Sequence, residues 1–158
     1  MPASLACVTS GAMRILVPID FGESAQQALA WASALHRAVG GGTIKLLHII
    51  TLPSLASDLR ASVAMTPSAE EVERLQEALS ELAERHAADA QLELEIVAAG
   101  DVGTAIVEAA NQWPAELIVL GTHGRSALGR LVFGSVAVYV TQHANCPVTT
   151  VRAPHTSH

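Results

Sequence analysis

Short apolar stretches of strand length alternate along this chain with longer stretches in which apolar residues recur at helical spacing. The apolar stretches are residues 13–19, 43–50, 92–98, 117–120 and 147–151. The helical stretches between them are residues 24–39, 68–86, 101–113 and 135–143. This alternation predicts an α/β fold, an open five-stranded parallel sheet with helices on both faces.

Polar residues with helix-capping chemistry stand at the start of several helical stretches. Ser24 with Gln27 and Ser68 with Glu71 have the spacing of a capping box, and Asp101 precedes the third helical stretch. We therefore expect helices to begin at Ser24, Ser68 and Asp101.

Two of the strand stretches differ in pattern, and the difference predicts their places in the sheet. Residues 117–120 are continuously apolar, which is typical of a central parallel strand covered on both faces. Residues 92–98 alternate apolar residues with Glu93 and Glu95, which favours an edge strand with one wet face.

The length and composition favour one compact domain. The chain has 158 residues, of which 50% are hydrophobic, so a single domain over residues 13–152 is expected. Residues 1–12 and 153–158 read as flexible ends. The net charge is -6, aromatic residues make up 3% and no basic run occurs. These values argue against a nucleic-acid partner.

The cysteines and the apolar runs indicate a cytoplasmic protein. Cys7 and Cys146 are far apart in sequence and form no disulfide framework, which favours a reducing compartment. Residues 1–12 lack the positive charge of a signal peptide. No apolar run approaches the ~20 residues needed to span a bilayer, so no membrane partner is expected.

The ends of the first and fourth strand stretches define a candidate site. Ligands of open parallel sheets bind outside the carboxyl ends of the strands, where the strand order reverses. One reversal is expected between these two strands, which end at Asp20 and Gly121. An acidic side chain and a glycine-marked loop would then face one crevice. Asp20 has an alternative role, which is to cap the turn over residues 21–24.

The glycine-marked loop that follows the fourth strand has anion-binding chemistry. Glycines let backbone N–H groups approach an anion closely, and the N-terminus of the following helix favours phosphate. The alternative is a surface loop with turn glycines and a serine that caps the helix. The key positions of the loop are Gly121, Gly124, Gly134 and Ser135, with Arg125 and Arg130 as sources of positive charge.

The spacing Gly-x2-Gly-x9-Gly-Ser of this loop resembles the ATP-binding signature of the universal stress protein family. Its flanks resemble the same family over about residues 13–152. The matching segments are 17–21 (VPIDF), 46–49 (LLHI), 117–125 (LIVLGTHGR), 134–137 (GSVA) and 146–148 (CPV). Val102 departs from the family, since many members have proline there, and Thr149 and Thr150 stand where apolar residues are common.

The resemblance implies a sheet order of 3-2-1-4-5, ATP in the crevice and a homodimer paired through the last strands. It implies that Asp20 contacts the ribose and Ile49 the adenine, with the loop holding ribose and phosphates. The contacts to adenosine would serve ATP and AMP alike, and Mg²⁺ on the phosphates is compatible with the site. The expected binding residues are Pro18, Asp20, Ile49, Gly121, Gly124, Arg125, Gly134, Ser135 and Val136.

The sequence favours binding over catalysis. It has no Walker loop, because its one lysine, Lys45, lies within a strand, and it has no G-x-S-x-G nucleophile motif. His48 is expected to be a hydrogen-bonded core histidine. The prediction is a nucleotide-dependent stress or regulatory protein with a protein partner still to be identified. The alternatives are a slow ATPase or nucleotidyl transferase on the same site, and a nucleotide-free dimeric scaffold.

Overall fold

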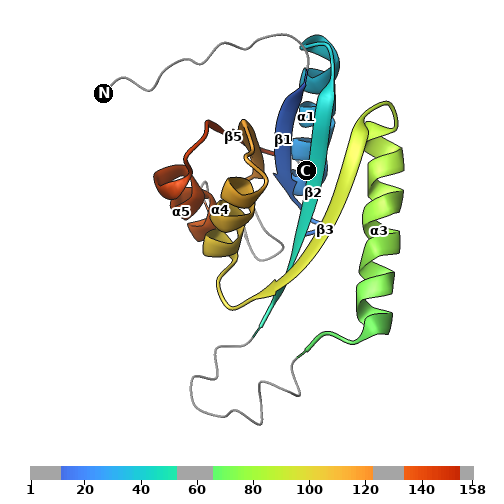
Figure 1. The fold of residues 1–158 in the computed structure, drawn as a ribbon, viewed down its shortest axis with the longest axis vertical. Coiled ribbons are helices and arrows are strands. Elements are labelled where there is room, and N and C mark those ends of the chain that lie inside the picture. The colour runs from blue at the N-terminus through green and yellow to red at the C-terminus, as the bar shows by residue number, and fades with distance from the viewer. Residues whose placement is uncertain (1–11, 53–65, 123–133, 154–158) are drawn as a thin grey trace, which may run out of the picture.

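The computed structural model describes residues 12–52, 66–122 and 134–153. The predicted order of alternating strands and helices is confirmed (Figure 1). The strands are β1 (Met13–Pro18), β2 (Gly42–Thr51), β3 (Gln91–Ala99), β4 (Leu117–Gly121) and β5 (Val148–Val151). The helices are α1 (Glu23–Ala38), α3 (Ala69–Ala87), α4 (Val102–Gln112) and α5 (Ser135–His143).

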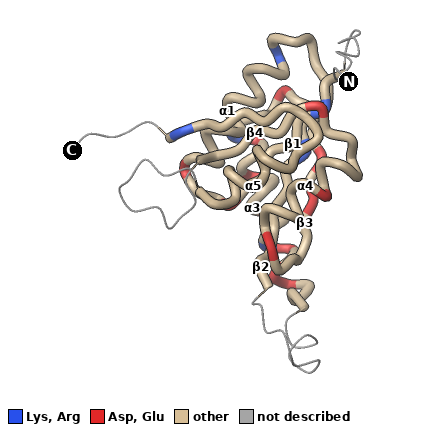
Figure 2. The backbone as a smooth tube through the Cα atoms, turned by 90° about the vertical axis from the view of Figure 1, so that its left-hand side faces the viewer, with Lys and Arg blue, Asp and Glu red and all other residues tan. Residues whose placement is uncertain are grey.

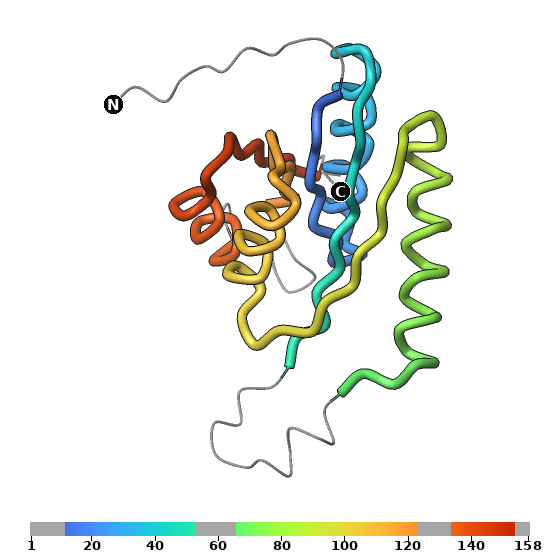
Figure 3. Tube along the Cα trace, viewed as in Figure 1, coloured from blue at the N-terminus to red at the C-terminus, as the bar shows by residue number. Residues whose placement is uncertain are grey.

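The five strands form one parallel sheet in the order β3-β2-β1-β4-β5, as the family resemblance implies. The trace in Figure 3 runs from β1 outward through β2 to β3, then crosses to the other side of β1 and continues through β4 to β5. The strand order therefore reverses between β1 and β4. This is the place where open parallel sheets bind ligands.

Helices cover both faces of the sheet. Successive side chains of each strand point to opposite faces, so neighbouring residues pack on different helices. Ile15 packs with residues of α1 and α3, whereas Leu16 packs with residues of α4 and α5. Figure 1 shows α3 on one side of the sheet, with α4 and α5 together on the other. Residues 117–120 of β4 are buried, as the continuous apolar pattern predicts for a central strand.

The edge position of β3 is also confirmed. Glu93 and Glu95 lie on the face that carries Lys45 of β2, and the Lys45 Nζ is 3.4 Å from a Glu93 oxygen and 3.0 Å from a Glu95 oxygen. Leu94, on the opposite face, is 40% exposed, so the alternation does not bury every apolar residue of this strand. The one lysine of the chain is thus engaged within the sheet.

Two of the three predicted helix starts are confirmed. The Ser68 hydroxyl accepts the Glu71 N–H at 3.1 Å, and the Asp101 carboxylate accepts the Thr104 N–H at 2.7 Å. The prediction for Ser24 is wrong, because α1 begins at Glu23 and Ser24 is a buried residue of its first turn. The residue at the N-cap is Gly22, whose carbonyl accepts the Gln26 N–H at 3.2 Å.

Candidate functional site

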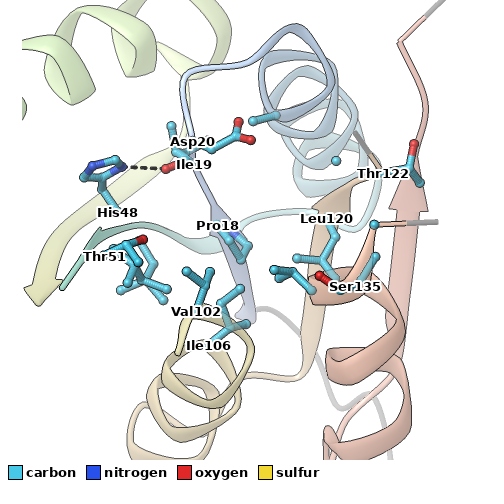
Figure 4. A pocket seen from close by; sticks show the side chains of 17 residues that line it. Pro18, Ile19, Asp20, His48, Thr51, Val102, Ile106, Leu120, Thr122 and Ser135 are labelled. Atoms are coloured by element: carbon cyan, nitrogen blue, oxygen red, sulfur yellow. Dashed lines mark hydrogen bonds between the residues drawn. The ribbon is translucent and has the colours of Figure 1, made fainter. Parts of the chain in front are cut away.

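A cavity of about 310 Å³ opens at the carboxyl ends of β1, β2 and β4, between the first turns of α4 and α5 (Figure 4). Its volume lies at the lower end of the range of ~300–1,000 Å³ typical of small-molecule sites. Its position is the predicted crevice at the reversal of strand order. The lining residues are Pro18, Ile19, Asp20, Ala25, Leu47, His48, Ile49, Thr51, Val102, Ile106, Leu120, Gly121, Thr122, Gly134, Ser135, Val136 and Ala137.

The floor of the cavity is apolar. Leu47 and Ile49 of β2 point to the same face of the sheet, and Val102 and Ile106 of α4 lie on that face (Figure 4). Leu120 of β4 closes the floor on the side of α5. An apolar floor with a few polar groups at its rim suits a flat, largely apolar ligand group such as a nucleobase.

Asp20 is the one carboxylate among the described residues that line the cavity. It stands two residues after the end of β1 at Pro18, and its Oδ1 accepts the Gly22 N–H at 2.8 Å. The residue therefore caps the turn into α1 and lines the cavity at the same time. The two roles considered for it from the sequence are compatible, since a carboxylate can accept several hydrogen bonds.

The N-terminus of α5 forms the opposite wall. Its N-cap is Gly134, which has no side chain to cap the helix, and Ser135 is its exposed first residue. The predicted helix over residues 135–143 is confirmed, and the alternative in which the Ser135 hydroxyl caps it is wrong. The first N–H groups of a helix have no partner within the helix and carry its positive partial charge. They lie beside the cavity, because Gly134, Ser135, Val136 and Ala137 line it.

The positive character of this wall comes from the backbone. Among the described residues that line the cavity there is no lysine or arginine. Acidic residues are more frequent than basic ones along the described trace in Figure 2, and the net charge of the chain is -6. A phosphate at this wall would therefore be bound by local N–H groups rather than by the overall field of the protein.

The N-terminus of α4 has a different chemistry, although it borders the same cavity. The Asp101 carboxylate caps α4 by accepting the Thr104 N–H. Hydrogen bonding by the side chain of Thr104, and to a lesser extent by its backbone, lowers the pKa of the Asp101 carboxyl. A negative charge already occupies this helix end. Of α4 and α5, it is α5 whose N-cap residue provides no side-chain cap, so its N-terminus is the one left for an anion.

Gly121 meets a packing requirement of the fold. A Cβ added to Gly121 would lie 2.6 Å from the carbonyl carbon of Ser24 and 2.7 Å from the backbone nitrogen of Ala25. These atoms belong to the first turn of α1, which therefore packs directly on the end of β4. Gly134 meets no such requirement, since its φ is -58° and an added Cβ would have only the Thr122 carbonyl oxygen near it, at 3.4 Å.

The cavity brings together most of the binding residues predicted from the sequence. Gly124, Arg125 and Arg130 lie outside the described residues, as do residues 1–11, 53–65 and 154–158. The predicted residues that line the cavity are Pro18, Asp20, Ile49, Gly121, Gly134, Ser135 and Val136.

Several lining residues were missed by the sequence reasoning. Val102 was noted only as a departure at the entry to α4, and Ile106 and Thr51 were not singled out. The signal that finds them is positional. The start of α4 must lie at the carboxyl edge of the sheet, and residues two apart on β2 share one face. For His48 the expected hydrogen bond is confirmed, from Nδ1 to the Ile19 carbonyl at 2.7 Å, but the expected core position is wrong, because the side chain is half-buried and lines the cavity.

The fold and the cavity can now be compared with known proteins. Residues 11–152 match the sequence profile of the universal stress protein family. The chain belongs to the universal stress protein family. Universal stress protein MJ0577 of Methanocaldococcus jannaschii is 29% identical over 153 residues, which cover 88% of this chain and 94% of that protein. Universal stress protein MJ0531 of the same organism is 49% identical over 49 residues, which cover 31% of this chain and 29% of that protein.

Solved structures of universal stress proteins share this architecture. UspA from Lactobacillus plantarum superimposes with a TM-score of 0.73 at 26% identity, covering 90% of this chain and 99% of that one. The universal stress protein from Archaeoglobus fulgidus in complex with dAMP superimposes with a TM-score of 0.65 at 25% identity, covering 88% of this chain and 97% of that one.

The described residues form neither a metal-binding cluster nor a membrane-spanning helix. Within residues 12–52, 66–122 and 134–153, no three His, Cys, Asp or Glu side chains are grouped so that they could hold a metal ion. Over the same residues, no helix combines the length and the apolar character needed to cross a bilayer.

Proposed function

We propose that this universal stress protein binds an adenine nucleotide, ATP or AMP, in the cavity at the carboxyl edge of its sheet. The observation that carries the proposal is a single cavity that joins an apolar floor, a carboxylate and an uncapped helix N-terminus. These three features match the base, the ribose and the phosphates of a nucleotide. Binding rather than turnover is the activity, and the protein acts in stress response or regulation.

In this proposal each part of the nucleotide meets a different element. The adenine lies on the apolar floor beside Ile49 and Pro18, and a ribose hydroxyl donates to the Asp20 carboxylate. The phosphates accept N–H groups at the start of α5. Mg²⁺, when present, is held by phosphate oxygens and water, since Asp20 is the one described carboxylate of the lining. The proposed binding residues are Pro18, Asp20, Ile49, Gly121, Gly124, Arg125, Gly134, Ser135 and Val136.

The dAMP complex of the Archaeoglobus fulgidus protein supports this choice of ligand. That protein has the same fold as this chain over nearly its whole length, and its ligand is an adenine nucleotide. The cavity volume of about 310 Å³ is consistent with a ligand of that class.

Titration calorimetry with ATP, AMP, adenosine and GMP tests the proposal. ATP and AMP are expected to bind, adenosine more weakly because it lacks the phosphates, and GMP more weakly than AMP. The Asp20→Asn variant keeps an acceptor for the Gly22 N–H but loses the charge, so it should fold normally and bind AMP more weakly. Glu116→Gln, an exposed carboxylate outside the lining, is the matched control. The proposal fails if neither ATP nor AMP binds at millimolar concentration.

The described lining also supports binding without turnover. Asp20 and His48 are its two titratable side chains, and each already has a hydrogen bond to the backbone, at Gly22 and Ile19 respectively. Release of phosphate or AMP from ATP by the pure protein measures turnover, with Gly124→Val as the control. A rate well above background that this substitution abolishes would replace the binding role with an enzymatic one.

We also propose a homodimer that pairs through β5. This strand is at the edge of the sheet, and the carbonyls of Pro147 and Val151 accept N–H groups of Ile118 and Thr122. Because backbone groups alternate in direction along a strand, those of Val148 and Thr150 point away from β4, toward the open edge.

Thr150→Pro tests this dimer without touching the pairing of β5 with β4. The substitution removes an N–H that points toward the open edge, so light scattering after size exclusion should give a monomer. A wild-type protein that is already monomeric would contradict the proposal, and so would a variant that remains a dimer.

A further inference from the structure

The turn that carries Asp20 has a strained backbone. Phe21 follows Asp20 with a φ of 62°, in the left-handed region that bulky residues rarely adopt. Such a conformation persists only where the surrounding structure holds it in place. The contacts that hold this turn therefore also determine where the Asp20 carboxylate lies.

Within the turn the Gly22 N–H donates to the Asp20 carboxylate, and the Gln26 side-chain amide donates to the Phe21 carbonyl at 3.5 Å. The contacts from outside the turn and α1 include those of two consecutive residues of β2. The Ile19 N–H donates to the Leu47 carbonyl at 2.8 Å, and the Ile19 carbonyl accepts from Nδ1 of His48 at 2.7 Å. The His48 and Phe21 rings also contact each other, with their centroids 4.9 Å apart. Figure 4 shows the imidazole beside Ile19, with this hydrogen bond as a dashed line. His48 thus touches the turn on both sides of Asp20.

The bond from His48 stands where a bond between strands would otherwise form. In a continued parallel ladder, the Ile19 carbonyl would accept the N–H of Ile49, two residues after Leu47. Among the described residues that carbonyl accepts from His48 instead, and β1 ends one residue earlier, at Pro18. The Ile49 N–H therefore does not make this bond between the strands, and Ile49 is one of the residues that line the cavity.

The hydrogen-bond chemistry fixes the state of the imidazole. A carbonyl only accepts, so Nδ1 must carry the proton in this bond. A side chain without a donor at that place would leave the Ile19 carbonyl to the Ile49 N–H and would release the strained turn.

We propose that His48 is a positioning residue of the nucleotide site. By donating from Nδ1 to the Ile19 carbonyl it holds Asp20 at the cavity and keeps the Ile49 N–H open to a ligand. This inference rests on the proposed nucleotide binding, because it assigns His48 a task at that same site.

Two substitutions separate the donor from the bulk of the side chain. His48→Asn keeps an N–H donor close to the place of Nδ1, whereas His48→Leu keeps apolar volume without any donor. The dissociation constant of AMP is expected to rise about tenfold in His48→Leu and to stay within about threefold of wild type in His48→Asn. The control is His86→Leu, which removes another partly buried histidine, in the last turn of α3. This variant should leave the dissociation constant of AMP unchanged.

Calorimetry on folded protein distinguishes positioning from a structural role. A residue that only stabilises the fold lowers the free energy of unfolding but leaves the affinity of the folded fraction unaltered. Equal wild-type affinity in His48→Leu and His48→Asn would overturn the proposal. Equal weakening in both variants would also overturn it, because the ring rather than the donor would then be required.

Chemical shifts of the nucleotide-free protein test the role of His48 independently of nucleotide binding. Amide chemical shifts of Asp20 and Gly22 should move in His48→Leu and return toward wild type in His48→Asn, and imidazole ¹⁵N shifts should report the Nδ1-protonated form. Unmoved amide shifts in His48→Leu would overturn the positioning role even if AMP binds. A wild-type protein that binds no AMP but shows these shifts would overturn the proposed function and leave His48 as a residue that positions the turn alone.

Discussion

The N-termini of α4 and α5 border the same cavity, yet they differ in what they leave for a ligand. α4 is capped by the Asp101 carboxylate, whereas α5 begins after Gly134 with no side-chain cap. Both helices have a positive N-terminal end. One is already neutralised within the protein, and the other has no side-chain cap among the described residues. In the proposed binding mode, local capping chemistry, more than proximity to the cavity, therefore decides which helix end binds the phosphate.

The same comparison separates two glycines that one motif treats as equivalent. Gly121 is required because the first turn of α1 packs against it, so it would be needed even without a ligand. Gly134 has an ordinary backbone and space beside it, so its missing side chain serves the open end of α5. If the proposed nucleotide binding is correct, this motif combines a glycine required by the fold with one required by the ligand.

The largest effect is expected at Gly121. In Gly121→Ala the added Cβ would meet backbone atoms of Ser24 and Ala25 at 2.6 and 2.7 Å, which no rotamer change relieves. The free energy of unfolding should fall by about 3 kcal/mol or more. Urea unfolding followed by circular dichroism measures it. An alanine variant of near wild-type stability would remove the distinction between the two glycines.

Gly134→Asp is expected to have the next largest effect, and on affinity rather than stability. The aspartate would cap α5 as Asp101 caps α4, and its charge would repel a phosphate. The dissociation constant of AMP should rise at least tenfold, or about 1.4 kcal/mol, while the stability rises by a few tenths of a kcal/mol. Adenosine, which has no phosphate, is the control ligand and should lose much less affinity. An equal loss for adenosine would place the phosphate elsewhere.

The sequence predicted those parts of the fold that depend on periodicity and strand polarity. Apolar runs and helical spacing predicted the order of the elements. Because parallel strands end at the same edge of a sheet, the pattern also predicted that Asp20 and Gly121 lie close together. The resemblance to the family added the sheet order and Ile49.

The remaining features depend on contacts that a linear pattern does not contain. The bond from His48 to Ile19 requires the register of β2 against the end of β1. The left-handed conformation of Phe21 has no counterpart in the sequence pattern, and the start of α1 at Glu23 rather than Ser24 is within the usual variation of helix boundaries. The sequence predicts that α5 starts at Ser135, but it leaves two roles open for the serine, and only the structure shows that the N-cap is Gly134.

A third helix end, which does not line the cavity, provides a control for the loss of a cap. The Ser68 hydroxyl caps α3 through the Glu71 N–H, so Ser68→Ala should reduce the free energy of unfolding by about 1 kcal/mol. The affinity for AMP should not change, because Ser68 does not line the cavity. Gly134→Ala, at a helix without a side-chain cap, should change stability by less than Ser68→Ala. A larger loss in Gly134→Ala would mean that this glycine also serves the fold.

The smallest effect is expected from the titration of Asp101, and it tests directly whether a charge occupies the end of α4. Hydrogen bonds from Thr104 lower the pKa of this carboxyl in the folded protein below its ordinary value of 3.8. The folded state therefore binds the proton less readily than the unfolded state, so the stabilisation is fully present above that ordinary value and is lost as the pH falls through the folded pKa.

The measurement is the difference in urea midpoint between wild type and Asp101→Asn, in which the contributions of all other carboxylates cancel. This difference should be small and positive at neutral pH and should vanish in acid, whereas the difference for Ser68→Ala should not depend on pH. If the Asp101→Asn difference persists in acid, the cap acts through geometry alone, and the contrast with α5 would then rest on the missing side chain rather than on charge.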